Sequence, residues 1–89
     1  MNRILKIGLD VHTTNFTICI AEPQLGSDGN FLLSTQTKPD VKLLLDVVNT
    51  FKKKFKDDEF DITFGYEAGC LGYSLYKELK NKGYRCIIL

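Results

Sequence analysis

The stretch ILKIGLDVHTTNFTICIA, from Ile4 to Ala21, decides the fold because it holds two apolar runs joined by a short polar link. Ile4 to Asp10 is predicted to form one β-strand and Phe16 to Ala21 a second. The link VHTTN has a length typical of a β-hairpin. Asp10 ends the first run, where an unpaired buried carboxylate would be costly. The stretch therefore predicts an antiparallel strand pair with one charged side chain that needs an explanation.

The rest of the chain alternates helical and strand-like patterns. The expected elements are a strand at Phe31–Thr35, a helix with its apolar face between Val41 and Phe55, a strand at Ile62–Tyr66, a helix at Leu71–Lys82 and a strand in RCIIL, residues 85–89. Between the first helix and the fourth strand, DDEFD breaks the pattern. Connections through helices imply parallel, right-handed neighbours. The sequence thus predicts an α/β fold with a ribonuclease-H-like mixed sheet in the order β-β-β-α-β-α-β.

Length and composition favour one small globular domain over residues 1–89. Apolar residues make up 44% and charged residues 26%, and 12 basic residues nearly balance 11 acidic ones. The net charge of +1 gives no global argument for nucleic acid or membrane, so a contact with a polyanion would need a local patch. In particular, the lysines of KKKFK (residues 52–56) are directly followed by DDE, which favours a solvated, charge-balanced helix end.

The cysteines and the two ends of the chain indicate the cellular compartment and whether the chain is a fragment. The chain has an odd number of cysteines, namely Cys19, Cys70 and Cys86, and no two of them form a CxxC pair. This argues against a disulfide framework or a structural zinc site. Without a signal peptide or a membrane-spanning run, we expect a cytoplasmic protein with no membrane partner. The chain ends in an apolar strand, which is an aggregation hazard, so we expect a fragment of a longer protein. A small domain with a terminal strand is the alternative.

Two carboxylates end apolar strands: Asp10 closes ILKIGLD and Glu67 closes ITFGYE. Ligand sites lie at the carboxyl ends of parallel strands, so these side chains would project side by side if their strands are neighbours. A divalent cation would offset the repulsion between them, and Mg²⁺ prefers oxygen ligands, including one or two protein carboxylates. The pair therefore predicts half of a metal site for phosphodiester chemistry. For either residue alone, the alternative is a side chain that caps the next turn or faces water.

Two further residues are candidates for supporting this site. His12 lies two positions beyond Asp10 and points the same way in an extended chain, so it could contact the metal's outer sphere or a phosphate. A solvated loop histidine is the alternative. Gly69 would help open the second helix and leave backbone amides accessible to an anion. Close packing of helix on sheet is its alternative role.

The segments IGLDVHTTNFTICIAE and YEAGCLGYSLYKELKNKGYRCIIL together resemble the N-terminal, RuvC-like catalytic domain of DEDD-type insertion-sequence transposases of the IS-one-ten family. In that family a GLDVH-like segment carries the first catalytic aspartate and a YEA-like segment carries a catalytic glutamate. These matches fall on Asp10 and Glu67, and they imply catalysis and binding of Mg²⁺ or Mn²⁺. The family's other two catalytic aspartates follow the fifth strand, so a chain ending at Leu89 is expected to lack them and to be inactive alone.

The resemblance implies that the parent protein is a transposase or site-specific recombinase that cleaves and transfers DNA strands with divalent metal. Its partners would be DNA and, in some members, a guide RNA. The resemblance leaves open whether the protein forms a homo-oligomer. One alternative is a RuvC-like or YqgF-like Holliday-junction resolvase, although His12 replaces the glycine usual in the YqgF type. Another is a non-catalytic module for dimerisation or nucleic-acid binding.

Overall fold

The structure is a computed structural model that describes residues 2–22, 30–67, 69 and 73–89. In chain order its elements are β1 (Asn2–Val11), β2 (Phe16–Glu22), β3 (Asn30–Thr37), α1 (Val41–Lys53), β4 (Glu59–Tyr66), α2 (Ser74–Asn81) and β5 (Arg85–Ile88). The predicted order β-β-β-α-β-α-β is confirmed. None of the helices in the described part of the chain is long and apolar enough to cross a membrane.

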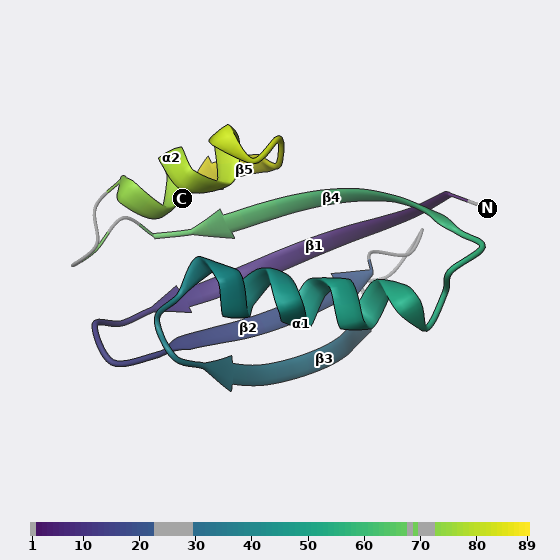
Figure 1. The fold of residues 1–89 in the computed structure, drawn as a ribbon, viewed down its shortest axis with the longest axis horizontal. Coiled ribbons are helices and arrows are strands. Elements are labelled where there is room, and N and C mark those ends of the chain that lie inside the picture. Colours follow the sequence, from purple (N-terminus) through teal and green to yellow (C-terminus); the bar gives the residue numbers. More distant parts are fainter. Residues whose placement is uncertain (1, 23–29, 68, 70–72) are drawn as a thin grey trace.

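The strands form one mixed sheet with the spatial order β3-β2-β1-β4-β5 (Figure 1). β1, β2 and β3 make an antiparallel meander. β4 runs parallel to β1, and β5 runs parallel to β4. The α/β class and the ribonuclease-H-like arrangement predicted from sequence are therefore confirmed, including the parallel pairing of the first and fourth strands.

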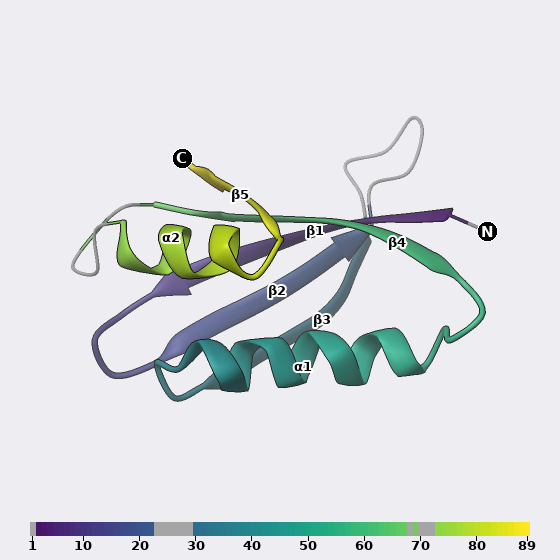
Figure 2. The ribbon, with the colours of Figure 1, turned by 45° about the horizontal axis from the view of Figure 1, so that its top comes forward.

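The two faces of the sheet differ in what packs on them. On β1 the side chains of Leu5, Ile7 and Leu9 are buried beneath the helices, and we call this side the covered face. Successive side chains of a strand point to opposite faces, so Asp10 belongs to the other side, the open face. Both helices lie on the same side of the sheet (Figure 2). Within the described residues, no element packs on the open face.

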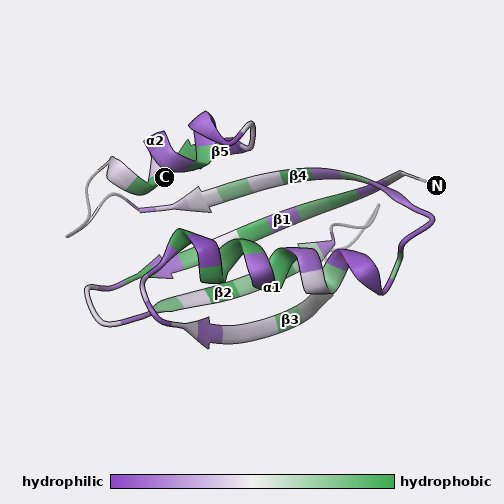
Figure 3. Ribbon diagram, viewed as in Figure 1, coloured by the Kyte–Doolittle hydropathy of each residue, from purple (hydrophilic) through white to green (hydrophobic). Residues whose placement is uncertain are grey.

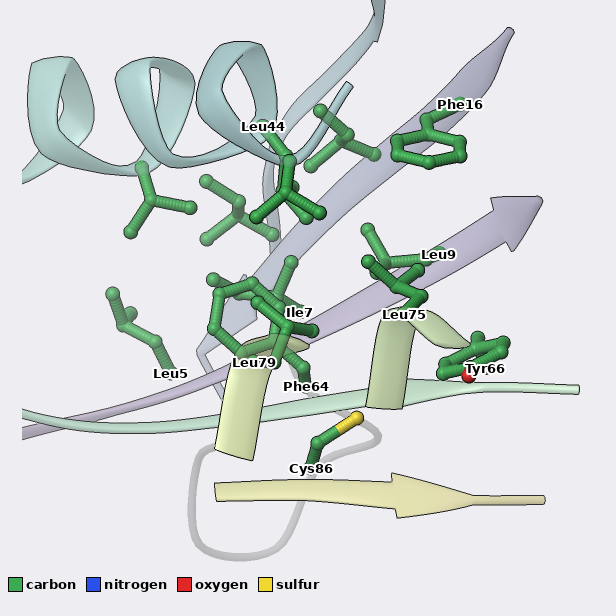
Figure 4. Close-up of a cluster of buried hydrophobic side chains, with 14 of the residues drawn as sticks. Leu5, Ile7, Leu9, Phe16, Leu44, Phe64, Tyr66, Leu75, Leu79 and Cys86 are labelled. Atoms are coloured by element: carbon green, nitrogen blue, oxygen red, sulfur yellow. The ribbon is translucent and has the colours of Figure 1, made fainter. Parts of the chain in front are cut away.

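The core lies between the helices and the covered face. Figure 4 shows Leu44 of α1 and Leu75 and Leu79 of α2 directed toward the same group of strand side chains. Its buried members are Leu5, Ile7, Leu9, Phe16, Ile18, Ile20, Val41, Leu44, Val48, Phe51, Phe64, Tyr66, Leu75, Leu79 and Cys86. Apolar and polar residues alternate along the ribbon of α1, as expected for a helix with one buried face (Figure 3).

The helix ends are defined by local hydrogen bonds. Asp40 caps α1, because its Oδ1 accepts a 2.8 Å hydrogen bond from the backbone N–H of Lys42. After α2, Gly83 has a φ of 88°, and its N–H bonds the carbonyl of Lys80 at 3.0 Å. The N–H of Tyr84 bonds the carbonyl of Leu79 at 3.0 Å, which completes a Schellman motif. The expected start of this helix at Leu71 lies outside the described residues.

The fourth strand is longer than predicted. It begins at Glu59, so EFD belongs to β4 and does not break the pattern. Phe60 packs against the core in alternation with Ile62 and Phe64, whereas Asp61 is exposed and pairs with Arg85 of β5 at 3.0 Å. The charged residues concealed the strand in the sequence because they occupy the positions directed away from the core.

Arg3 ties the start of β1 to two distant segments. Its Nε and Nη2 donate to the carboxylate oxygens of Glu22 at 3.0 and 2.7 Å. Its Nη1 lies 3.5 Å from Oδ2 of Asp58, and its guanidinium carbon lies 3.8 Å from the ring centroid of Phe55. One side chain therefore joins β1, β2 and the connection between α1 and β4.

The described cysteines behave as reduced residues. Cys86 is buried in the core, as its apolar run predicts. Cys19 is half-buried, and its Sγ lies 3.6 Å from Oγ of Ser34 on the neighbouring strand. Cys70 lies outside the described residues.

Candidate functional site

Asp10 and Glu67 are brought to the same end of the sheet by strand register. The parallel pairing of β1 with β4 runs from Asn2 opposite Glu59 to Leu9 opposite Tyr66. Asp10 and Glu67 are each the next residue along, at the carboxyl ends of neighbouring parallel strands. Neighbouring strands lie about 4.8 Å apart, so the two backbones approach within reach of a shared ligand. This is the juxtaposition that the sequence predicts.

Both carboxylates line one open cleft of about 440 Å³. The other residues around it are Leu9, Val11, Gly69 and Leu89. The side chain of Asp10 is 72% exposed, and Glu67 is exposed as well. The strand of Asp10 does enter the core, but its alternation places this side chain on the open face. The aspartate is therefore not buried, and the cost of a buried carboxylate does not arise.

His12 lies beside Asp10, with its Nε2 atom 3.1 Å from Oδ1 of the aspartate. Its backbone N–H donates to the carbonyl of Asn15 at 3.0 Å, which fixes the start of the hairpin turn. The imidazole is 56% exposed, so water reaches it freely. The expectation that His12 points the same way as Asp10 agrees with this contact, which involves only the Oδ1 oxygen of Asp10.

Beside the carboxylates the open face is bare at Gly8, whereas the side chain of Ile87 lies against Gly65, with Cγ1 3.5 Å from the position of a Cβ there. Gly8 stands opposite Gly65 in the β1–β4 register, two positions before Asp10 and Glu67. Among the described residues, nothing lies within 4 Å of a Cβ built on Gly8 or on Gly69. Gly69 is exposed at the rim of the cleft and precedes α2 rather than beginning it. A ligand could thus approach the backbone beside both carboxylates.

Sequence reasoning did not anticipate the part played by the end of β5. Leu89 follows β5, and its N–H donates to the carbonyl of Tyr66 at 2.9 Å, so it borders the cleft next to Glu67. The topology would have predicted the position of Leu89, because the parallel strands β4 and β5 end at the same edge of the sheet.

The donors in the cleft suit a hard divalent cation that keeps much of its water. Two carboxylates with open solvent on one side match the way Mg²⁺ is usually held, by one or two protein carboxylates plus water and phosphate. Across the described residues, no group of three or more His, Cys, Asp and Glu side chains gathers closely enough to enclose a metal. Asp10 and Glu67 are the carboxylates in this cleft that would hold such an ion.

The chain is similar along its whole length to one curated protein, the transposase for insertion sequence element IS1533 of Leptospira borgpetersenii. The two are 35% identical over 89 residues, which is 100% of this chain and 24% of the relative. The chain thus spans about a quarter of the length of the relative that it matches. No protein-family model matches the chain.

Among solved structures, the chain resembles part of Marinitoga piezophila Argonaute, crystallised in complex with a 5′ OH guide RNA. The match covers 90% of this chain and 14% of the Argonaute chain, with 16% identity and a TM-score of 0.41.

Proposed function

We propose that this chain is part of a transposase and supplies two acidic residues, Asp10 and Glu67, to a divalent-metal site for DNA strand cleavage and transfer. The observation that carries the proposal is their position at the ends of neighbouring parallel strands, in one solvent-open cleft. The similarity to an insertion-sequence transposase over all 89 residues supports the class of protein. The DNA substrate and the metal, Mg²⁺ or Mn²⁺, belong to the proposal.

In this proposal each residue of the cleft has a distinct task. The carboxylates of Asp10 and Glu67 would hold the cation from two adjacent strands. A bound cation of this kind polarises a phosphoryl oxygen and lowers the pKa of bound water. His12, 3.1 Å from Oδ1 of Asp10, would orient that carboxylate. The open space at Gly8 and Gly69, as far as the described residues define it, would let a phosphodiester chain approach the carboxylates without a clash.

Two carboxylates are few for this chemistry. Two-metal phosphodiester cleavage places ions about 3.5–4 Å apart, and both need ligands. The described residues offer one such pair, so we expect the 89-residue chain to bind metal weakly and to cleave DNA little by itself. In a complete site, further acidic ligands would have to come from elsewhere.

Calorimetric titration with Mn²⁺ and Mg²⁺ tests the metal site. We expect wild-type protein to bind one ion weakly, and both Asp10→Asn and Glu67→Gln to abolish the heat signal. Asp61→Asn is the matched control, because Asp61 is an exposed carboxylate near the other end of β4 that pairs with Arg85. Equal loss of binding in the Asp61 variant, or unchanged binding in the other two, would refute the assignment.

Cleavage of branched and duplex DNA with Mn²⁺ tests the expected inactivity. We expect no cleavage above the level of the Asp10→Asn variant. Robust cleavage by this chain that depends on Asp10 would confirm the metal chemistry but contradict the statement that two carboxylates are too few. The two experiments therefore separate metal binding from turnover.

A further inference from the structure

A group of lysines surrounds a second cleft at the C-terminal end of α1. Lys52 and Lys53 lie in the last turn of that helix, and Lys56 follows it. These three residues, which we call the lysine cluster, line a cleft of about 540 Å³. The cleft is completed by Asp46, Asn49, Thr50, Asp58 and Phe60. It therefore combines three ammonium groups and two carboxylates with amide and hydroxyl groups and one aromatic ring.

The acidic residues near the lysine cluster make no close ion pair with its lysines in the described part of the chain. Among the described residues, no ion pair within 4.0 Å involves any of its three lysines. Asp58, the acid that shares the cleft, lies 3.5 Å from the guanidinium of Arg3. Lys52 instead places its ammonium 5.9 Å from the ring centroid of Phe60. Three cations thus remain available to an external anion.

The lysine cluster and the carboxylate pair lie at opposite ends of the molecule. The cluster is next to Glu59, where β4 begins, whereas Glu67 follows its last residue. Eight residues of extended strand span about 26 Å. In Figure 1 the end of α1 lies near the N-terminus, and the tips of β1 and β4 lie at the far side. Phe60 also packs on the covered face, whereas Asp10 belongs to the open face.

We propose that the lysine cluster binds the phosphodiester backbone of a nucleic acid, at a segment other than the one that meets Asp10 and Glu67. The choice of nucleic acid among polyanions rests on the proposed function. In a nucleic acid, phosphates bind ammonium groups and bases stack on aromatic rings. The concave site offers both kinds of side chain, so it suits a sugar–phosphate chain with its bases. Because the two sites are on opposite faces and about 26 Å apart, binding at the cluster needs neither metal nor the carboxylates.

Fluorescence anisotropy in the presence of EDTA tests this site, with labelled single-stranded DNA, duplex DNA and single-stranded RNA as probes. The triple variant Lys52→Gln, Lys53→Gln, Lys56→Gln is expected to bind the preferred probe at least about tenfold more weakly than wild type at near-physiological salt. The slope of log affinity against log salt should fall by about 2 to 3, corresponding to the loss of three phosphate contacts. The three probes distinguish DNA from RNA as the source of the backbone.

The matched control removes three positive charges from another surface. Lys77, Lys80 and Lys82 are exposed on and just after α2, so changing all three to glutamine alters the net charge equally. This control should bind within about twofold of wild type if the site is local. Circular dichroism verifies that both triple variants fold.

The outcomes that overturn the proposal are also distinct. Equal weakening in both triple variants would indicate a non-specific charge effect, and absence of EDTA-resistant binding in wild type would remove the site. Stronger, cluster-dependent binding to anionic phosphatidylserine vesicles than to any oligonucleotide would point to a membrane surface instead. Asp10→Asn should leave this binding unchanged, so failure of the metal site and failure of the lysine cluster are told apart.

Discussion

The hydroxyl of Tyr66 accepts a 2.9 Å hydrogen bond from the backbone N–H of Tyr76. Tyr66 is the last residue of β4 and only 1% exposed, and Tyr76 lies in the first turn of α2. N–H groups in a first helical turn have no partner within their own helix, so the tyrosine satisfies one of them. The bond holds α2 against the strand end that Glu67 follows.

Replacing this hydroxyl should therefore destabilise the fold. We expect Tyr66→Phe to lower the free energy of unfolding by roughly 1–3 kcal/mol, because it leaves the part-buried backbone N–H of Tyr76 without this partner. Urea denaturation followed by circular dichroism measures the change. Tyr73→Phe is the control: that side chain is 60% exposed, and its loss should change the free energy by less than about 0.5 kcal/mol. Equal effects in the two variants would mean that the hydrogen bond does not stabilise the helix.

Alkaline pH should weaken the fold through two groups in the core. Burial raises the pKa of the Cys86 thiol above its ordinary value of 9.0, and burial also raises that of the Tyr66 hydroxyl above 10.0. The folded state holds both protons more tightly than the unfolded chain does. Their contribution is thus fully present below pH 9.0 and declines as the pH rises through the folded-state values. Unfolding curves at increasing pH measure this loss of stability. In Cys86→Ala the free energy of unfolding should begin to decline less steeply. A free energy of unfolding that rises above pH 9.0 would contradict the prediction.

Gly83 should be sensitive to substitution for a conformational reason alone. Its φ of 88° lies in the left-handed region, where a side chain costs roughly 1–2 kcal/mol. Gly8 offers a matched comparison, because a Cβ at either position meets nothing within 4 Å among the described residues. We expect Gly83→Ala to lower the urea midpoint and Gly8→Ala to leave it equal or higher, since strands lose less entropy with alanine. The reverse order would show that the Schellman turn is not a constraint.

The bidentate contacts of Arg3 predict that lysine cannot replace it. Lysine keeps the charge but loses the planar fork that meets Glu22 and the stacking on Phe55. We expect Arg3→Lys to lower the thermal midpoint more than Arg85→Lys does. Arg85 is 64% exposed, and Asp61 is its ion-pair partner at 3.0 Å. Indistinguishable midpoints would show that fork geometry contributes nothing here.

The sequence predicts local features of this protein well because they depend on near neighbours. The alternation of Ile7, Gly8, Leu9 and Asp10 identifies a strand, and the helical links identify parallel pairing, which brings Asp10 to the level of Glu67. Strand ends marked by apolar runs therefore sufficed to predict that Asp10 and Glu67 lie at the same end of neighbouring strands.

Side-chain ion pairs between distant segments were not predictable. The pairing of Asp58 with Arg3 joins residues 55 positions apart, and it changes the interpretation of the lysines beside Asp58. Likewise, Glu59 and Asp61 concealed the start of β4, because their charges face away from a core that only the assembled sheet defines. The chain order of charges does not indicate which of them meet in space.

The central claim, that Asp10 and Glu67 bind one divalent cation together, is tested most directly by titrating Mn²⁺ into isotope-labelled protein and observing the amide signals by NMR. Paramagnetic broadening should centre on Asp10, Val11, Glu67 and Leu89 and leave Lys53 sharp, and either Asp10→Asn or Glu67→Gln should abolish it. Broadening that centres elsewhere, or that persists unchanged in both variants, would contradict the claim.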